Sequence, residues 1–168
     1  YDFRKRIGIY GPISDVVPST PVFEMYPIGF AILSEYLERH GLRVRIVNLA
    51  LKMLKDEKFD VEKFIRRQNP VAFGLDLHWM AHVQGTLAIA EIIKRIHPKT
   101  PVLLGGLSAT YYHEEILREY PFIDFVVRGD STEKPVLQLL QTLKGDRHFK
   151  PIPNLTWRDE KNEIRVNP

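Results

Sequence analysis

The sequence predicts an α/β protein with a doubly wound, five-stranded parallel sheet and a short β-hairpin at its C-terminal end. Short apolar runs alternate with amphipathic stretches, as strands and helices alternate in parallel sheets. The tail, NLTWRDEKNEIRV, has two strand-like runs around turn residues 159–162. A length of 168 residues, with 44% apolar and 27% charged residues, is typical of one domain with its own core.

Each element follows from its own pattern. Apolar runs between turn residues predict strands at 4–10, 42–49, 71–75, 101–106 and 124–129. Apolar residues at helical spacing predict helices at 28–40, 61–68, 81–97, 112–120 and 133–144. Gly41 is expected to cap the first helix, and Pro98 ends the third.

The predicted alternation favours a flavodoxin-like, or Rossmann-like, strand order. Right-handed crossovers then bring every strand-to-helix loop to one edge of the sheet. Ligands of such sheets bind at this carboxyl edge. The loops in which to look for a site are therefore 11–27, 76–80, 105–110 and 128–133.

Composition excludes several classes of function. The net charge of +3 is small and the basic residues are scattered, which argues against nucleic-acid binding. No apolar run reaches membrane-spanning length, and no signal peptide is present. Cysteine is absent, so the chain forms no disulfide and no thiolate-held zinc or iron–sulfur site. A cytoplasmic location fits best.

The loops contain no recognisable phosphate site. The first loop lacks both GxGxxG and the Walker lysine, which argues against a nucleotide-dependent enzyme. The pair Gly105 and Gly106 either makes a tight turn, with Ser108 capping a helix, or lets a flat ligand approach the backbone. Gly129 and Asp130 can likewise make a turn and a helix cap.

The stretch GLDLHWMAH places Asp76, His78 and His82 at the end of a predicted buried strand. The two histidines are four residues apart and would share a helical face. They are either metal ligands or structural residues. Trp79 and Met80 suggest one wall of a broad apolar pocket.

Four stretches together resemble the cobalamin (vitamin B12)-binding domain that precedes the catalytic barrel in many radical SAM enzymes. They are YPIGFAILSEYLERHGLRVRIVNL, PVAFGLDLHW, TPVLLGGLSAT and FVVRGDSTEKPVLQLLQTL. The last has Gly-Asp where the family usually has Gly-Glu-Gly-Glu. IPNLTWRDEKNEIRVNP is similar to the strand pair that links this domain to the barrel.

The resemblance implies a base-off cobalamin, with its corrin on the carboxyl edge and its nucleotide tail between sheet and helices. A side chain at Gly105 or Gly106 would then collide with the cofactor. The implied contact residues are Gly11, Pro12, Asp76, His78, Trp79, Gly105, Gly106, Ser108, Arg128, Gly129 and Asp130.

A cobalt ligand is less clearly implied. The family's DxHxxG motif follows the first strand, whereas here Asp76 and His78 follow the third and Ala81 replaces the glycine. His78 either ligates cobalt, contacts the corrin or tail, or only packs. Imidazole suits a cobalt ion, and Asp76 could fix the ring's tautomer.

The resemblance also implies a division of labour. Residues 1–150 would form the cobalamin-binding domain, and 151–168 a hairpin leading to a radical SAM barrel of the same polypeptide. That barrel would hold the 4Fe-4S cluster and S-adenosylmethionine, so the 168 residues would be a fragment that is no enzyme by itself. The alternative is a degenerate, cobalamin-free domain that serves as an interaction or substrate-covering surface.

Overall fold

The structure of the chain is a computed structural model, which describes residues 28–168. The chain divides into two compact units, with the division between Phe64 and Ile65. The strand predicted at 4–10, and with it Gly11 and Pro12, lies outside the described residues.

The first unit contributes helices α2 (Ile28–Arg39) and α3 (Leu49–Lys55), and α4 (Val61–Arg66) begins within it. Gly41 ends α2 with a φ of 77°, and the Leu42 amide donates to the Leu37 carbonyl across 3.0 Å. This is the left-handed cap that the sequence predicts at Gly41, where only glycine avoids strain.

The strand predicted at 42–49 is wrong. Residues 42–48 form no strand, and Leu49 already belongs to α3. The side chain of Asn48 accepts a hydrogen bond of 2.9 Å from the Leu51 amide and so caps α3. An alternating apolar pattern needs a neighbouring strand before it forms a ladder, whereas an Asn cap acts locally.

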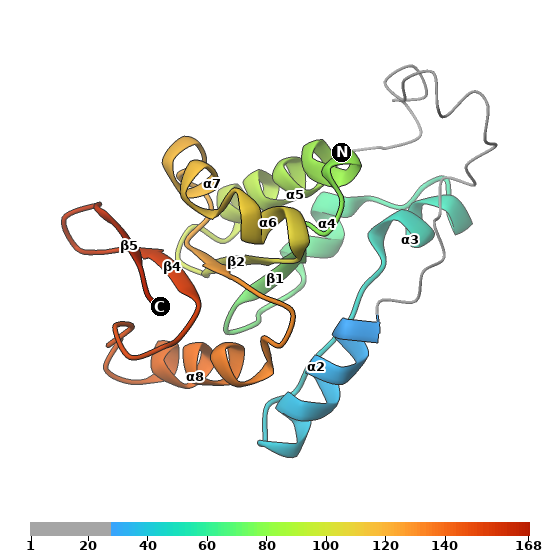
Figure 1. Cartoon of the computed structure of the whole chain (residues 1–168). Coiled ribbons are helices and arrows are strands. Elements are labelled where there is room, and N and C mark those ends of the chain that lie inside the picture. Colours follow the sequence, from blue (N-terminus) through green and yellow to red (C-terminus); the bar gives the residue numbers. More distant parts are fainter. Residues whose placement is uncertain (1–27) are drawn as a thin grey trace. The chain divides into compact units, whose positions relative to one another are not determined.

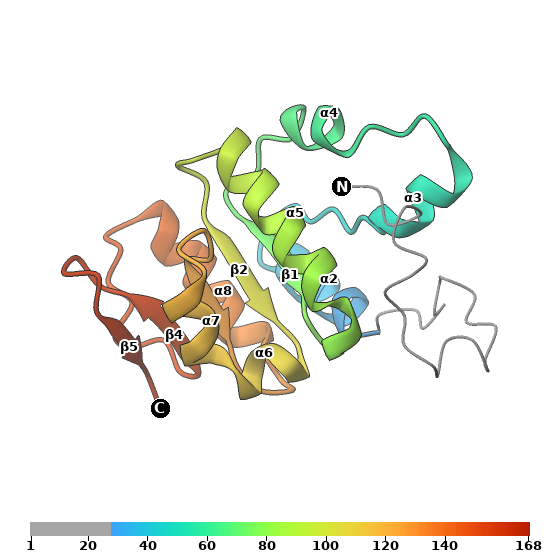
Figure 2. The same ribbon diagram turned by 90° about the horizontal axis from the view of Figure 1, so that it is seen from above.

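The second unit contains one sheet with the strand order β1-β2-β3-β4-β5 (Figure 2). Strands β1 (Phe73–Asp76), β2 (Val102–Gly105) and β3 (Phe125–Val127) run parallel. Strands β4 (Leu155–Arg158) and β5 (Ile164–Val166) form the predicted hairpin and add to β3 antiparallel. The sheet is thus five-stranded and mostly parallel, although two of its strands come from the hairpin.

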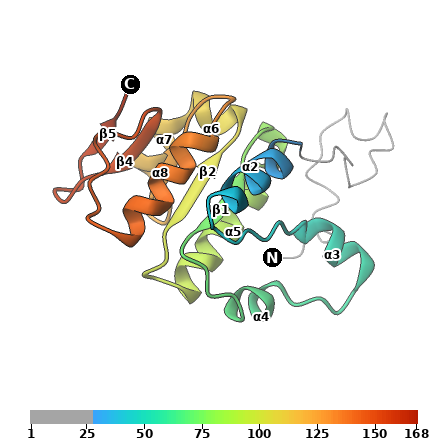
Figure 3. The same cartoon turned by 90° about the horizontal axis from the view of Figure 1, so that it is seen from below.

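Helices cover both faces of this sheet. Figure 1 shows α5 (Val83–Ile96), α6 (Leu107–Tyr111) and α7 (His113–Glu119) on one face and α8 (Glu133–Lys144) on the other. In Figure 3, seen from below, α8 lies in front of the sheet. Leu104 and Val126 in the central strands are fully buried, as expected of strands covered on both faces. The prediction of a doubly wound, Rossmann-like fold is confirmed.

Two helix boundaries differ from the predicted ones. The helix predicted at 81–97 begins at Val83, because Met80–His82 forms a 3-10 turn before it. The helix predicted at 112–120 is preceded by α6, which begins directly after Gly106. Ser108 is therefore the second residue of α6 and not its cap. No described helix has the length and apolar character needed to cross a membrane.

The amino ends of the strands are joined by paired charges. The Lys94 ammonium on α5 donates to both carboxylate oxygens of Asp124, at 2.9 and 2.7 Å. Asp124 in turn accepts a hydrogen bond of 2.7 Å from the Val102 amide. Arg158 of β4 donates to the carbonyls of Leu117 and Tyr120 at the end of α7. We call this end of the sheet, at which the parallel strands β1, β2 and β3 begin, the amino edge.

Candidate functional site

The carboxyl ends of β1, β2 and β3 lie together, as the parallel register requires. Asp76, the last residue of β1, pairs with Gly105, the last of β2. The loops that leave these strands are residues 76–80, 105–110 and 128–130, and we call them together the carboxyl rim. Except for Gly11 and Pro12, all residues predicted to contact a cofactor lie in the rim.

Backbone hydrogen bonds join the first two rim loops. The Leu77 amide donates to the Gly105 carbonyl across 2.8 Å, and the Ala109 amide donates to the Leu77 carbonyl across 3.1 Å. The Ser108 amide and hydroxyl both donate to the His78 carbonyl, at 3.3 and 2.9 Å. The first N–H groups of α6 are therefore satisfied by the chain itself.

The two adjacent glycines have different roles. Gly106 has a φ of 102°, and a Cβ there would lie 2.7 Å from the backbone nitrogen of His78. At Gly105 a Cβ would meet only the Val127 carbonyl oxygen, at 3.9 Å. The collision predicted at Gly106 is therefore with the chain's own loop. Of these two glycines, only Gly105 could carry a side chain without a clash among the described residues.

Thr110 connects the second and third rim loops, a role that the sequence did not predict. Its hydroxyl donates to the Gly106 carbonyl and accepts from the Gly129 amide, each across 3.0 Å. Gly129, like Gly106, has a positive φ, here 96°. A threonine four residues after a positive-φ glycine is a weak sequence signal, because its second partner is distant in the chain.

Two apolar side chains of the rim are open to solvent. Trp79 and Met80 are each 51% exposed, at the point where β1 leads into the 3-10 turn. The rings of His78 and Trp79 meet edge to face, with their centroids 4.9 Å apart. An aromatic residue and a thioether beside a strand end offer a surface to a large flat ligand.

Asp76 faces Gly106, since its Oδ1 atom lies 2.8 Å from where a Cβ of Gly106 would be. Burial by the rim raises the pKa of the Asp76 carboxyl, and the nearby His78 and His82, together with the His78 backbone amide, oppose this rise. In the described chain, no hydrogen bond joins the carboxyl of Asp76 to the ring of His78. The tautomer role predicted for Asp76 therefore has no support.

A metal site made by protein side chains alone is not seen. Among residues 28–168, no three His, Cys, Asp or Glu side chains are close enough to hold a metal ion. Asp76, His78 and His82 thus do not form the ligand set that their spacing allowed. His78 remains a candidate for a single bond to a metal that a cofactor brings with it.

Arg128 is turned toward the C-terminal strand. Its guanidinium donates to the Asn167 carbonyl, and its amide donates to the Asn154 carbonyl across 2.9 Å. Burial lowers the pKa of Arg128, and burial followed by the charge of Arg128 lowers the pKa of His113. Gly129 and Asp130, the next residues, are exposed at the rim.

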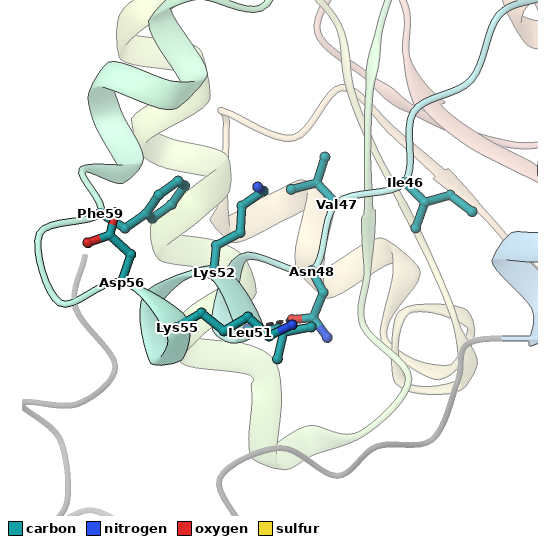
Figure 4. Close-up of a pocket in the computed structure, with 8 residues that line it drawn as sticks. All are labelled: Ile46, Val47, Asn48, Leu51, Lys52, Lys55, Asp56 and Phe59. Carbon is teal, nitrogen blue, oxygen red and sulfur yellow. Dashed lines mark hydrogen bonds between the residues drawn. The ribbon is translucent and has the colours of Figure 1, made fainter.

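A separate hollow of about 360 Å³ lies in the first unit (Figure 4). Its side chains come from α3 and from the segments on either side of it: Ile46, Val47, Asn48, Leu51, Lys52, Lys55, Asp56 and Phe59. None of them is a predicted site residue. The Lys52 ammonium lies over the rings of Phe59 and Phe64, with centroid distances of 5.7 and 5.6 Å.

Curated relatives are longer than this chain. An uncharacterized methyltransferase of Pyrococcus horikoshii is 31% identical over 144 residues, which cover 84% of this chain and 30% of the relative. The hopanoid C-3 methylase of Methylococcus capsulatus is 26% identical over 138 residues, 81% of this chain and 26% of the methylase. The chain thus spans less than a third of these two relatives.

Two solved enzymes contain the same fold. One is the radical S-adenosylmethionine methyltransferase TsrM of Kitasatospora setae with cobalamin and a [4Fe-4S] cluster, at a TM-score of 0.70 and 22% identity over 84% of this chain and 26% of TsrM. The other is the cobalamin-dependent S-adenosylmethionine radical enzyme OxsB with aqua-cobalamin and S-adenosylmethionine, at 0.67 and 17% over 83% of this chain and 19% of OxsB.

The family itself is shown by a match along most of the chain. The sequence model of the B12 binding domain matches residues 15–136, which include the rim loops after β1, β2 and β3. The resemblance stated from the four sequence stretches is thereby confirmed, with cobalamin as the cofactor of the family. The chain belongs to the B12-binding domain family.

Proposed function

We propose that the chain is the cobalamin-binding module of a radical SAM protein and holds base-off cobalamin at its carboxyl rim. One observation carries the location. The rim loops are fixed by hydrogen bonds to one another, while the described neighbours leave room for a Cβ at Gly105, and Trp79 and Met80 remain exposed. This combination of a rigid backbone and open apolar side chains suits a large, preformed ligand site.

The residues present fit a corrinoid. Gly105 would form the floor, because the chain leaves its Cβ position open. Trp79 and Met80 would form an apolar wall, and the exposed Gly129 and Asp130 would border the opposite side. When bound, cobalamin supplies a cobalt that carries a methyl group or tunes a radical step. The module's own part is to bind and orient it.

His78 is our candidate for a protein ligand to cobalt. Its carbonyl accepts a hydrogen bond from the Ser108 hydroxyl, and its ring meets the exposed ring of Trp79. An imidazole ring in such a place can coordinate cobalt or lie against the corrin. The two roles give different spectra, so they can be separated.

The first experiment tests binding. The chain is mixed with hydroxocobalamin, unbound cofactor is removed by gel filtration, and the retained visible absorbance is measured. Retained colour at about one cobalamin per chain is the expected result. A colourless protein would contradict the proposal and favour the alternative, a cobalamin-free interaction or substrate-covering domain.

The second experiment identifies the lower ligand. Bound cob(II)alamin is examined by electron paramagnetic resonance in unlabelled and ¹⁵N-labelled protein. A histidine ligand gives a nitrogen splitting that changes with protein labelling and is lost in His78→Ala. A nitrogen splitting that is the same in unlabelled and ¹⁵N-labelled protein would show that the cofactor's own base is bound to cobalt, and would contradict base-off binding.

We further propose that the module works beside a radical SAM barrel of the same polypeptide, linked through residues 151–168. The greater length of the relatives supports this. The [4Fe-4S] cluster would be held by thiolates of the barrel, since the 168 residues contain no cysteine. A Cys-x-x-x-Cys-x-x-Cys motif in the coding sequence beyond residue 168 is the expected finding. Methyltransfer or cyclisation by the whole protein, and its cytoplasmic location, are predictions of the same kind.

A further inference from the structure

We propose that Thr110 is a positioning residue for the cofactor, whose hydroxyl sets the spacing between the two rim loops on which cobalamin rests. This inference depends on the proposed function, because it assigns a role within the same site. Thr110 is not among the residues predicted to contact cobalamin, but its hydroxyl bonds the backbones of two that are, Gly106 and Gly129.

The position of the hydroxyl is unusual because it serves two loops at once. It donates to the Gly106 carbonyl in the loop after β2, and it accepts from the Gly129 amide in the loop after β3. Both distances are 3.0 Å, within the normal range for a hydrogen bond. Thr110 therefore joins the two positive-φ glycines of the rim.

The two hydrogen bonds of Thr110 matter because both of their partners are glycines. Glycine samples many backbone conformations, so a loop that turns at glycine is poorly fixed unless hydrogen bonds hold it. Gly106 is held on its other side by the loop after β1, where its Cβ position meets His78 and Leu77. Gly129 is exposed, and among the described residues a Cβ there would meet only the side-chain nitrogen, Nδ2, of Asn154, at 3.9 Å. Of the two, Gly129 depends more on Thr110.

The two glycines that Thr110 joins lie next to further residues that are predicted to contact cobalamin. Gly106 adjoins Gly105, the open floor, and Gly129 adjoins Asp130 on the opposite side. A change in the distance between the two loops would alter the width of the site without removing any group that touches cobalamin. Loss of the hydroxyl is therefore expected to weaken binding more than it weakens folding.

The test compares three variants of the chain. Thr110→Val keeps the shape of the side chain but can neither donate nor accept, whereas Thr110→Ser keeps the hydroxyl. Thr156→Val is the matched control, because Thr156 is fully buried in β4 and its hydroxyl bonds His113 Nδ1 across 3.0 Å and no rim loop. Thr110→Ala replaces the valine variant should that one fail to fold.

Two quantities are measured: the Kd for hydroxocobalamin by visible titration, and the hydrogen-exchange rate of the Gly129 amide without cofactor. Thr110→Val should raise the Kd about tenfold, the size expected when the hydrogen bond that holds the Gly129 amide is lost, and speed exchange at Gly129. Thr110→Ser should restore both values. Thr156→Val should lower the melting temperature and leave the Kd unchanged.

The outcomes separate this inference from the proposed function. If the wild-type chain retains no hydroxocobalamin, the proposed function fails, and the positioning role falls with it. If the wild type binds but Thr110→Val or Thr110→Ala binds equally well, only the role of Thr110 is overturned. An equal rise in Kd in Thr110→Ser would also overturn it, because serine keeps the hydroxyl and the loss of affinity could then not come from its hydrogen bonds.

Discussion

The two edges of the sheet in the second unit use polar groups in opposite ways. At the amino edge, the charged side chains of Lys94, Asp124 and Arg158 are bonded to other parts of the chain. At the carboxyl rim, backbone groups and the hydroxyls of Ser108 and Thr110 join the loops to one another. Arg128 is bonded to Asn167, whereas Trp79 and Met80 stay exposed. Charged side chains at the amino edge thus stabilise the fold, whereas Trp79 and Met80 at the rim stay available to a ligand.

This difference teaches how a site can be both rigid and open. The rim loops are fixed without using Trp79 and Met80, the apolar side chains proposed to face a cofactor, because backbone groups and the hydroxyls of Ser108 and Thr110 make the connections. Preformed sites of this kind avoid the entropy of ordering loops on binding. Mutations at the two edges should accordingly separate stability from cofactor affinity.

The largest effect is expected at Gly106. Gly106→Val should lower the free energy of unfolding by about 3 kcal/mol, because the new Cβ would clash with the His78 backbone and valine disfavours a positive φ. Urea unfolding measures the loss. Gly105→Ala is the control and should unfold like the wild type while binding cobalamin less tightly. Equal unfolding of the two glycine variants would show that the rim loops are not held as described.

At the amino edge, Asp124→Ala should lower the free energy of unfolding by about 2 kcal/mol. The substitution removes the ion-pair partner of the Lys94 ammonium and the acceptor of the Val102 amide, and leaves Lys94 only its hydrogen bond to the Thr100 carbonyl. Its affinity for hydroxocobalamin should not change. A weaker affinity at unchanged stability would mean that the amino edge takes part in binding, and the contrast between the edges would fail.

At the rim, Trp79→Ala should weaken hydroxocobalamin binding about tenfold, as expected for one exposed aromatic wall residue. Because Trp79 is 51% exposed, urea unfolding should change little. Phe122→Ala, just before β3 at the amino edge, is the matched aromatic control. Unchanged affinity in Trp79→Ala would remove this residue from the proposed wall.

The smallest effect concerns the pH dependence of stability. Burial raises the pKa of Asp76 above its ordinary 3.8, so the folded state holds this proton more tightly than the unfolded state. Stability from this group is therefore full below pH 3.8 and falls as pH rises through the raised folded pKa. Asp76→Asn should be slightly more stable than wild type at pH 7, and the gain should vanish in acid. The rim covers the Asp76 carboxyl only in part, and the residue as a whole is exposed, so screening by solvent makes the change in stability small.

The sequence predicted the second unit well because its signals are local. Apolar runs at 71–75, 101–106 and 124–129 became β1, β2 and β3, and helix α8 has the predicted bounds of 133–144. The hairpin turn was found from Asp159 and Asn162, whose backbones bond across 2.9 Å. The strand predicted at 42–49 failed because strand formation depends on a neighbour that the pattern cannot supply.

The site was predicted as a set of loops but not in its connections. Glycines at strand ends mark the rim in the sequence, yet only the structure shows that Gly106 serves the loop after β1 and Gly105 does not. Thr110 escaped notice because its partner Gly129 is nineteen residues away. The cofactor contact of Arg128 stays a prediction, and the bond from its guanidinium to Asn167, near the end of the tail hairpin, has no signal in the sequence.

Hydrogen exchange of the chain with and without hydroxocobalamin tests the central claim most directly. If cobalamin rests on the carboxyl rim, backbone amides in residues 77–80, 105–110 and 128–130 should exchange more slowly in the bound state, while those in 98–102 and 120–124 should not change. Slower exchange at the amino edge, or binding that leaves the rim amides unprotected, would contradict the account.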